Sequence, residues 1–72
     1  MGMEMMFTTG ANWTSTDGKR NVVIEEEYVS RGTRAFVIRN LETDRKSRIE
    51  LPGLTRKFNY VGHDLNYTPK GR

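Results

Sequence analysis

A chain of 72 residues with a formal net charge of +3 makes one small domain, and domains of this size bury only about 60% of the surface that the unfolded chain exposes. The absence of cysteine and the single histidine exclude a disulfide framework, a cysteine-based metal site and an all-histidine metal site, and we expect no cofactor. No apolar run approaches the roughly 20 residues of a membrane span, and the N-terminal segment lacks the basic region of a signal peptide. We therefore expect a cytoplasmic protein that does not bind membranes.

The charge is distributed unevenly along the chain. Residues 1–30 carry two basic and five acidic side chains, a net charge of −3. Residues 31–57 carry eight basic and three acidic side chains, a net charge of +5, and the remaining residues add +1. Eight of the twelve basic residues are arginine, whose planar guanidinium suits bidentate contacts with carboxylate or phosphate. This polarity indicates an oriented surface for a macromolecular partner.

The first predicted elements are a short strand over Met3–Phe7 and a β-hairpin centred on Asp17-Gly18. Aspartate followed by glycine favours a two-residue turn, because both residues tolerate a positive φ. The resulting register places Trp13 opposite Val22, so that Trp13 covers one end of the hydrophobic core. The alternative is a mobile loop, since residues 12–20 are otherwise polar.

Three consecutive strands form the centre of the predicted fold, and they cover Val22–Val29, Thr33–Arg39 and Ser47–Leu51. β-Branched and aromatic residues, separated by breaks that contain glycine or aspartate, are typical of an antiparallel meander. Every short loop between the first two strands places one glutamate of Glu25–Glu27 opposite Phe36, where an unpaired carboxylate is costly to bury. We therefore expect a bulge or sharp bend that turns these glutamates outward at the rim. A helix over Val22–Arg31 is the weaker alternative.

The pairing of the last two of these strands follows from a four-residue loop at Thr43–Lys46. That loop places Arg39 opposite Glu50 and Ile38 opposite Leu51, and the first pair is an exposed contact between opposite charges. The interior face then carries four apolar side chains, and they are Phe36, Ile38, Ile49 and Leu51. A slip of one residue would exchange the two faces, so the apolar pattern and the charge pair support the same register.

The C-terminal third begins with Pro52-Gly53, a turn signal that ends the preceding strand. Residues 54–61 fit a strand with Phe58 and Tyr60 on one face, and they also fit one or two helical turns. We expect a short helical turn near residues 54–60 before a last strand. The single domain is predicted to cover residues 1–64, and residues 65–72 are predicted to be a flexible tail.

These elements predict a mostly β fold class. The strong bend expected in one strand is what a small closed barrel requires. We therefore expect a small five-stranded SH3-like barrel or a strongly bent antiparallel sheet. One short helical turn is expected near residues 54–60.

The acidic and histidine side chains do not form a recognisable catalytic group. Neighbouring residues of a strand point to opposite faces, so at most Glu25 and Glu27 converge, and no histidine is spaced to assist them. His63-Asp64 pairs a base with an acid, but sequence neighbours rarely form a working pair, and no serine lies in a nucleophile-elbow motif. We therefore expect no enzymatic activity.

The basic residues are the strongest functional signal. Two adjacent predicted strands, the loop between them and the following segment carry the predicted partner-binding residues, which are Arg34, Arg39, Arg45, Lys46, Arg48, Arg56, Lys57 and Tyr60. We predict a binding module that engages a protein with an acidic surface, such as a small phage-type or accessory inhibitor or adaptor.

Three alternatives remain for this surface. Nucleic acid, single-stranded DNA or RNA, is the rival partner, because basic grooves with aromatic side chains bind it. A self-assembling structural subunit is a further possibility, and an exposed rim also allows pairing with a partner strand. A solvated charged surface without a partner is the remaining interpretation.

Overall fold

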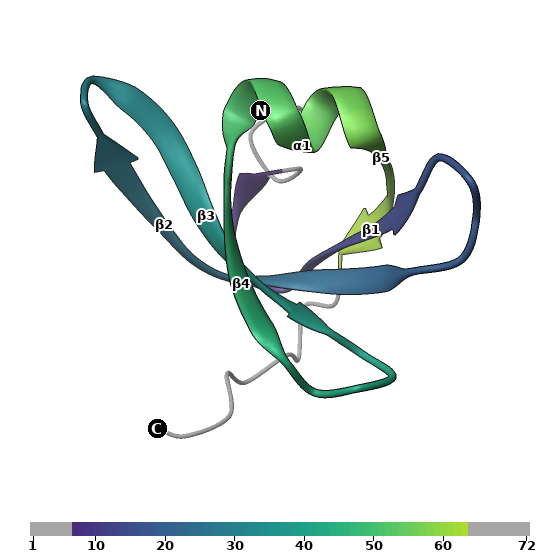
Figure 1. Cartoon of the computed structure of the whole chain (residues 1–72). Coiled ribbons are helices and arrows are strands. Elements are labelled where there is room, and N and C mark those ends of the chain that lie inside the picture. Colours follow the sequence, from purple (N-terminus) through teal and green to yellow (C-terminus); the bar gives the residue numbers. More distant parts are fainter. Residues whose placement is uncertain (1–6, 64–72) are drawn as a thin grey trace.

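The computed structural model describes residues 7–63 and shows five antiparallel strands in one sheet with one short helix (Figure 1). The elements in chain order are β1 (Ala11–Ser15), β2 (Asn21–Ser30), β3 (Thr33–Asn40), β4 (Lys46–Glu50), α1 (Leu51–Lys57) and β5 (Phe58–His63). The strand order is β4-β3-β2-β1-β5, so that β4 and β5 form the two edges of the sheet. The mostly β fold class predicted from the sequence is confirmed.

Two predicted segments lie largely or wholly outside the described residues. The predicted strand over Met3–Phe7 has one described residue, Phe7, which is not part of a strand. The predicted tail over residues 65–72 lies entirely outside.

The predicted hairpin between β1 and β2 is present, and the mobile-loop alternative is wrong. Trp13 lies opposite Val22, as the position of Asp17-Gly18 predicted. The turn is nevertheless wider than two residues, because the Ser15 amide donates to the Arg20 carbonyl at 2.8 Å and leaves four residues between them. Within the turn, positive φ is confined to Gly18, at +76°, where glycine carries no steric cost.

The Ser15 side chain explains the wider turn. Its hydroxyl oxygen accepts hydrogen bonds from the backbone amides of Lys19, at 3.1 Å, and Arg20, at 3.0 Å. The same hydroxyl donates to Asp17 Oδ1. The Ser15 hydroxyl and the Asp17 carboxylate therefore accept hydrogen bonds from amides of the four-residue turn. A two-residue turn would place these amides elsewhere, so the hydrogen bonds favour the wider turn.

The β2–β3 hairpin projects beyond the rest of the sheet (Figure 1) and contains the predicted bulge. Its turn residues Arg31 and Gly32 both have positive φ, +53° and +78°, as a two-residue type I′ turn requires. The register shifts between Ile24 and Glu26, which makes Glu25 the extra residue of β2. The extended β2 excludes the helical alternative. The expectation that all three glutamates turn outward is wrong for Glu25, which is only 3% exposed.

The predicted pairing of β3 with β4 is wrong in register. Arg39 lies opposite Lys46, and Glu50 lies opposite Ala35, so the predicted Arg39–Glu50 pair does not form. The loop has the predicted length of four residues, but it covers 41–44 in place of 43–46, because the Asn40 amide donates to the Arg45 carbonyl at 2.8 Å.

The side chain of Asn40 fixes this earlier loop. Its Oδ1 accepts hydrogen bonds from the amides of Glu42, at 2.8 Å, and Thr43, at 3.1 Å. The Asp44 amide closes the loop on the Asn40 carbonyl at 2.7 Å, with Asp44 at φ +65°. Asparagine is well suited to begin such a turn, since its side chain replaces backbone acceptors.

The four apolar side chains predicted for the interior face lie on that face despite the error in register. The pairing is displaced by two residues on each strand, and an even displacement leaves every side chain on its original face. Phe36 and Ile38 are buried, and Ile49 and Leu51 pack against them partly buried.

Residues 51–63 contain both the predicted short helix and the predicted last strand. Helix α1 begins with Leu51 and Pro52, so Pro52-Gly53 lies inside the first helical turn and is not the separate turn that we expected. Proline is favoured there because its missing amide would have no helical partner. β5 follows directly and pairs with β1, with one extra residue, Val61, between two paired positions.

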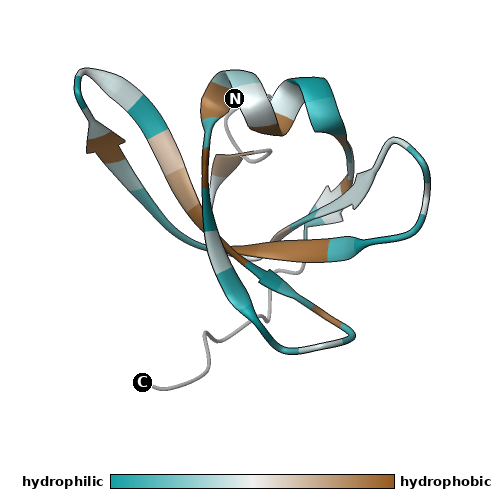
Figure 2. Ribbon diagram, viewed as in Figure 1, coloured by the Kyte–Doolittle hydropathy of each residue, from teal (hydrophilic) through white to brown (hydrophobic). Residues whose placement is uncertain are grey.

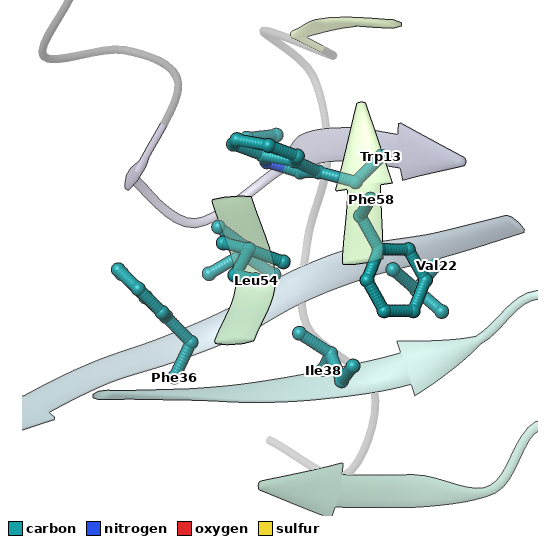
Figure 3. Packing of buried hydrophobic residues seen from close by; sticks show 8 residues of the cluster. Trp13, Val22, Phe36, Ile38, Leu54 and Phe58 are labelled. Carbon is teal, nitrogen blue, oxygen red and sulfur yellow. The ribbon is translucent and has the colours of Figure 1, made fainter. Parts of the chain in front are cut away.

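The hydrophobic core lies between the concave face of the sheet and α1. Its buried side chains are Ala11, Trp13, Val22, Ile24, Phe36, Ile38, Leu54 and Phe58. Leu54 of α1 is fully buried and lies among the core side chains of the strands in Figure 3. Figure 2 shows that most of β4 is hydrophilic, whereas β2 is hydrophobic near its start, over residues 22–24. The core therefore uses the middle of the sheet and leaves β4 largely to solvent.

Candidate binding surface

A buried ion cluster joins β2, β3 and the loop before β4. Arg39 was predicted to face water, but it is only 8% exposed. Its Nε donates to Glu25 Oε2 at 2.7 Å, and its Nη1 donates to Asp44 Oδ1 at 2.9 Å. The bulge places Glu25 in reach of Arg39, and the left-handed residue Asp44 brings the second carboxylate from the loop. One guanidinium thereby links three segments and is used inside the protein.

Three exposed cations follow Asp44 of this cluster in the chain. They follow one another closely along the chain, with Arg45 in the loop and Lys46 and Arg48 in β4. The Lys46 Nζ lies 4.0 Å from Glu25 Oε1, and its side chain remains about half exposed. Within residues 7–63, Arg45 and Arg48 make no ion pair. We refer to Arg45, Lys46 and Arg48 as the β4 cations.

A shallow hollow of about 310 Å³ lies beside the β4 cations. Its lining consists of Val37, Lys46, Ser47 and Arg48. Arg48 lies directly opposite Val37 in the sheet, and Val37 is half-buried. The hollow therefore combines an apolar residue with two cations.

Arg34 lies apart from the β4 cations. Its Nε donates to Glu27 Oε2 at 2.6 Å across the β2–β3 hairpin. Its guanidinium carbon lies 5.3 Å from the ring centroid of Phe7 and 6.0 Å from that of Phe36, within the range of cation–π attraction. Because alternate residues of a strand share a face, Arg34 shares the face of Phe36, whereas Arg48 faces the other way with Val37. Arg34 therefore covers the edge of the core.

Arg56, Lys57 and Tyr60 lie in a third region. The two cations are exposed in the last turn of α1, and the Thr16 amide donates to the Lys57 carbonyl at 2.9 Å, which places this helix end beside the β1–β2 turn. Tyr60 belongs to β5, the edge of the sheet opposite β4, and packs edge-on against Trp13 with ring centroids 5.6 Å apart. The eight predicted residues are thus divided among three regions and do not form one continuous surface.

The aromatic side chains of the described part of the chain serve mainly the core. Trp13, Phe36 and Phe58 are buried, and Phe7 and Tyr60 pack against the same cluster. Among residues 7–63, Tyr28 is the aromatic residue outside this cluster. By the strand register, Tyr28 shares the outer face of the sheet with Val37 and Arg48, so one aromatic side chain remains on that face.

The titratable side chains of residues 7–63 provide no metal site. No group of three or more histidine, aspartate or glutamate side chains is arranged to hold a metal ion there. His63 ends β5, and its Nε2 lies 2.9 Å from the Thr8 hydroxyl, while its Nδ1 is buried without a hydrogen-bond partner. None of the helices in this part is long and apolar enough to cross a membrane.

Two residues of the buried cluster were missed by the sequence analysis. Glu25 was assigned to the solvated rim and Asp44 to the loop, because neither lies near Arg39 in the predicted register. The predicted bulge was the available signal, since the extra residue of a bulge is displaced from the regular alternation. No family model matches the chain, and no curated protein or solved structure is significantly similar to it.

Proposed function

We propose that this chain is a non-enzymatic binding module that recognises an acidic surface of another protein through the β4 cations. The supporting observation is that neighbouring basic residues differ in their ion pairs and exposure. Arg39 is held by Glu25 and Asp44, whereas Arg45 and Arg48 stay exposed without an ion pair in the described part of the chain. Cations that the fold does not use internally keep their attraction for a partner, and such charges accelerate association and select partners. An inhibitor or adaptor role in the cytoplasm fits such a module.

An SH3-like form of the fold, with a strongly bent sheet, belongs to the same proposal. The sheet has the strand order β4-β3-β2-β1-β5, and a single short helix connects β4 to β5. Bulges in β2 and β5 add local bending. These features support an SH3-like barrel, which offers its edges and loops to partners.

Nucleic acid is the rival partner of the same cations. Binding of single strands without sequence preference relies on exposed aromatic faces beside a basic groove. Because five of the six aromatic residues within 7–63 pack in or against the core, an acidic protein fits the β4 cations better.

A pair of matched charge reversals tests the proposal. Lys46→Glu with Arg48→Glu changes the charge by −4 at β4, and Arg56→Glu with Lys57→Glu makes the same change at the end of α1. Each variant and the parent chain are used to capture proteins from the native cell, and folding is checked by circular dichroism. We expect the β4 variant to lose the captured protein and the α1 variant to retain it.

Oligonucleotide retention distinguishes the rival. Micromolar binding of single- or double-stranded DNA, with a slope of log affinity against log salt near about −3 or steeper, would assign the cations to nucleic acid. Equal loss of the captured protein in both variants would remove the β4 cations as the recognition surface and indicate a response to net charge alone.

A further inference from the structure

The free edge of β4 offers backbone groups in addition to its cations. β4 is an edge strand, and within residues 7–63 no strand pairs with its outer side (Figure 1). Its pairing with β3 is regular from Lys46 to Glu50, without a register shift. The other edge strand, β5, is interrupted by the extra residue Val61, and such bulges hinder the addition of another strand. β4 is therefore the better template for a sixth strand.

The register identifies which groups of β4 point outward. The hydrogen bond from the Asn40 amide to the Arg45 carbonyl marks this pair as directly bonded. Because bonded and non-bonded pairs alternate along antiparallel strands, Ser47 and Ile49 face β3, and the backbone groups of Lys46 and Arg48 point to the free edge. The Glu50 amide also points outward, whereas the carbonyl of this residue begins helix α1.

We propose that β4 receives an extended acidic segment of the partner protein as an added strand. The proposal rests on the proposed function and specifies the form of the partner. Lys46 and Arg48 lie on one face of β4 beside the hollow, and Ile49 lies on the face of the core. An added strand places its own side chains alternately on these faces. The segment that fits has acidic residues at every second position, opposite Lys46 and Arg48, and apolar residues between them, beside Ile49.

A second copy of the chain is the competing occupant of this edge. An antiparallel pair of β4 strands centred on Arg48 would place the two Arg48 side chains opposite each other, with Lys46 opposite Glu50. The central Arg48–Arg48 contact is destabilising, whereas the two flanking Lys46–Glu50 contacts are favourable, so the self-pair gains little from its charges. An acidic segment meets both cations with opposite charge, so charge complementarity favours it.

Two synthetic peptides test the proposal on the full chain. The first alternates glutamate with valine over nine residues. The second has the same sequence with the backbone nitrogen of every glutamate after the first methylated, so that it keeps its side-chain charges but the glutamates opposite Lys46 and Arg48 cannot donate to β4. Amide hydrogen exchange is followed by NMR at each residue of β4. We expect the first peptide to slow exchange at Lys46 and Arg48 by about tenfold or more, with little change at Ser47 and Ile49, whose amides already face β3. The methylated peptide is expected to bind at least about tenfold more weakly.

The outcomes separate this proposal from the one on which it rests. Equal binding of both peptides, abolished by Lys46→Glu with Arg48→Glu, would overturn strand addition and leave recognition of acidic partners by the β4 cations standing. Absence of binding by either peptide at low salt would overturn both. Protection of the Lys46 and Arg48 amides that rises with protein concentration in the absence of peptide would assign the edge to a second copy.

Discussion

Replacing Arg39 by methionine should destabilise the fold far more than the same change at an exposed arginine. The Glu25 side chain is only 2% exposed and lies 2.7 Å from Arg39 Nε. Removing one member of a buried ion pair costs about 3–5 kcal/mol, because the remaining charge stays buried without its counterion. Lys46 Nζ, 4.0 Å from Glu25 Oε1, offsets part of this loss, so we expect about 3 kcal/mol. Total stability for a domain of this size is roughly 4–11 kcal/mol.

The assay is urea unfolding followed by the fluorescence of Trp13, the single tryptophan, which is buried in the core. Arg48→Met is the matched control, and its exposed position predicts a change within about 0.5 kcal/mol. Adding Glu25→Gln to Arg39→Met should recover part of the lost stability, since the buried negative charge is removed as well. Equal unfolding midpoints for Arg39→Met and Arg48→Met would refute the internal role of Arg39.

Two further predictions concern the β1–β2 turn. Gly18→Ala should lower the unfolding free energy by about 1 kcal/mol, because the φ of +76° at this position is unfavourable for alanine, although no atom lies within 4 Å of the new Cβ. Gly62→Ala is the control. Its position is equally open but has no positive φ, so its unfolding free energy should not fall. The Ser15 hydroxyl and the Lys19 amide lower the pKa of Asp17 from its ordinary value of 3.8. Ionised Asp17 therefore favours the folded state above that pH, and this stabilisation disappears as the pH falls below it. The stability difference between the parent chain and Asp17→Asn, measured by urea unfolding, should shrink between about pH 6 and about pH 2, and a constant difference would contradict the hydrogen-bonded role of the carboxylate.

Local signals predicted much of the fold. Asp17-Gly18 placed Trp13 opposite Val22 because a turn signal fixes the register of short strands on either side. The bulge in β2 followed from the conflict between three consecutive glutamates and the buried Phe36. Both inferences needed only neighbouring residues and the alternation of a strand.

The errors arose where a side chain overrides the pattern of its strand. Leu41 is apolar, yet it is about half exposed in the loop that the Asn40 side chain begins. The strand pattern predicts Arg39 to be a solvent-facing cation. Its burial depends on Glu25, a residue 14 positions away that the bulge brings into contact with it. Of the predicted binding residues, the structure places Arg45, Lys46 and Arg48 together, because they follow one another along one loop and strand.

Arg39 is held inside the protein by Glu25, whereas Arg48 of the neighbouring strand is exposed and, in our proposal, meets the partner. The most direct measurement is the exchange with water of the Nε–H protons of these two arginines, resolved by NMR in the free protein. We expect slow exchange for Arg39, whose Nε–H donates to the buried Glu25 carboxylate, and rapid exchange for Arg48. Rapid exchange at both positions would contradict this expectation.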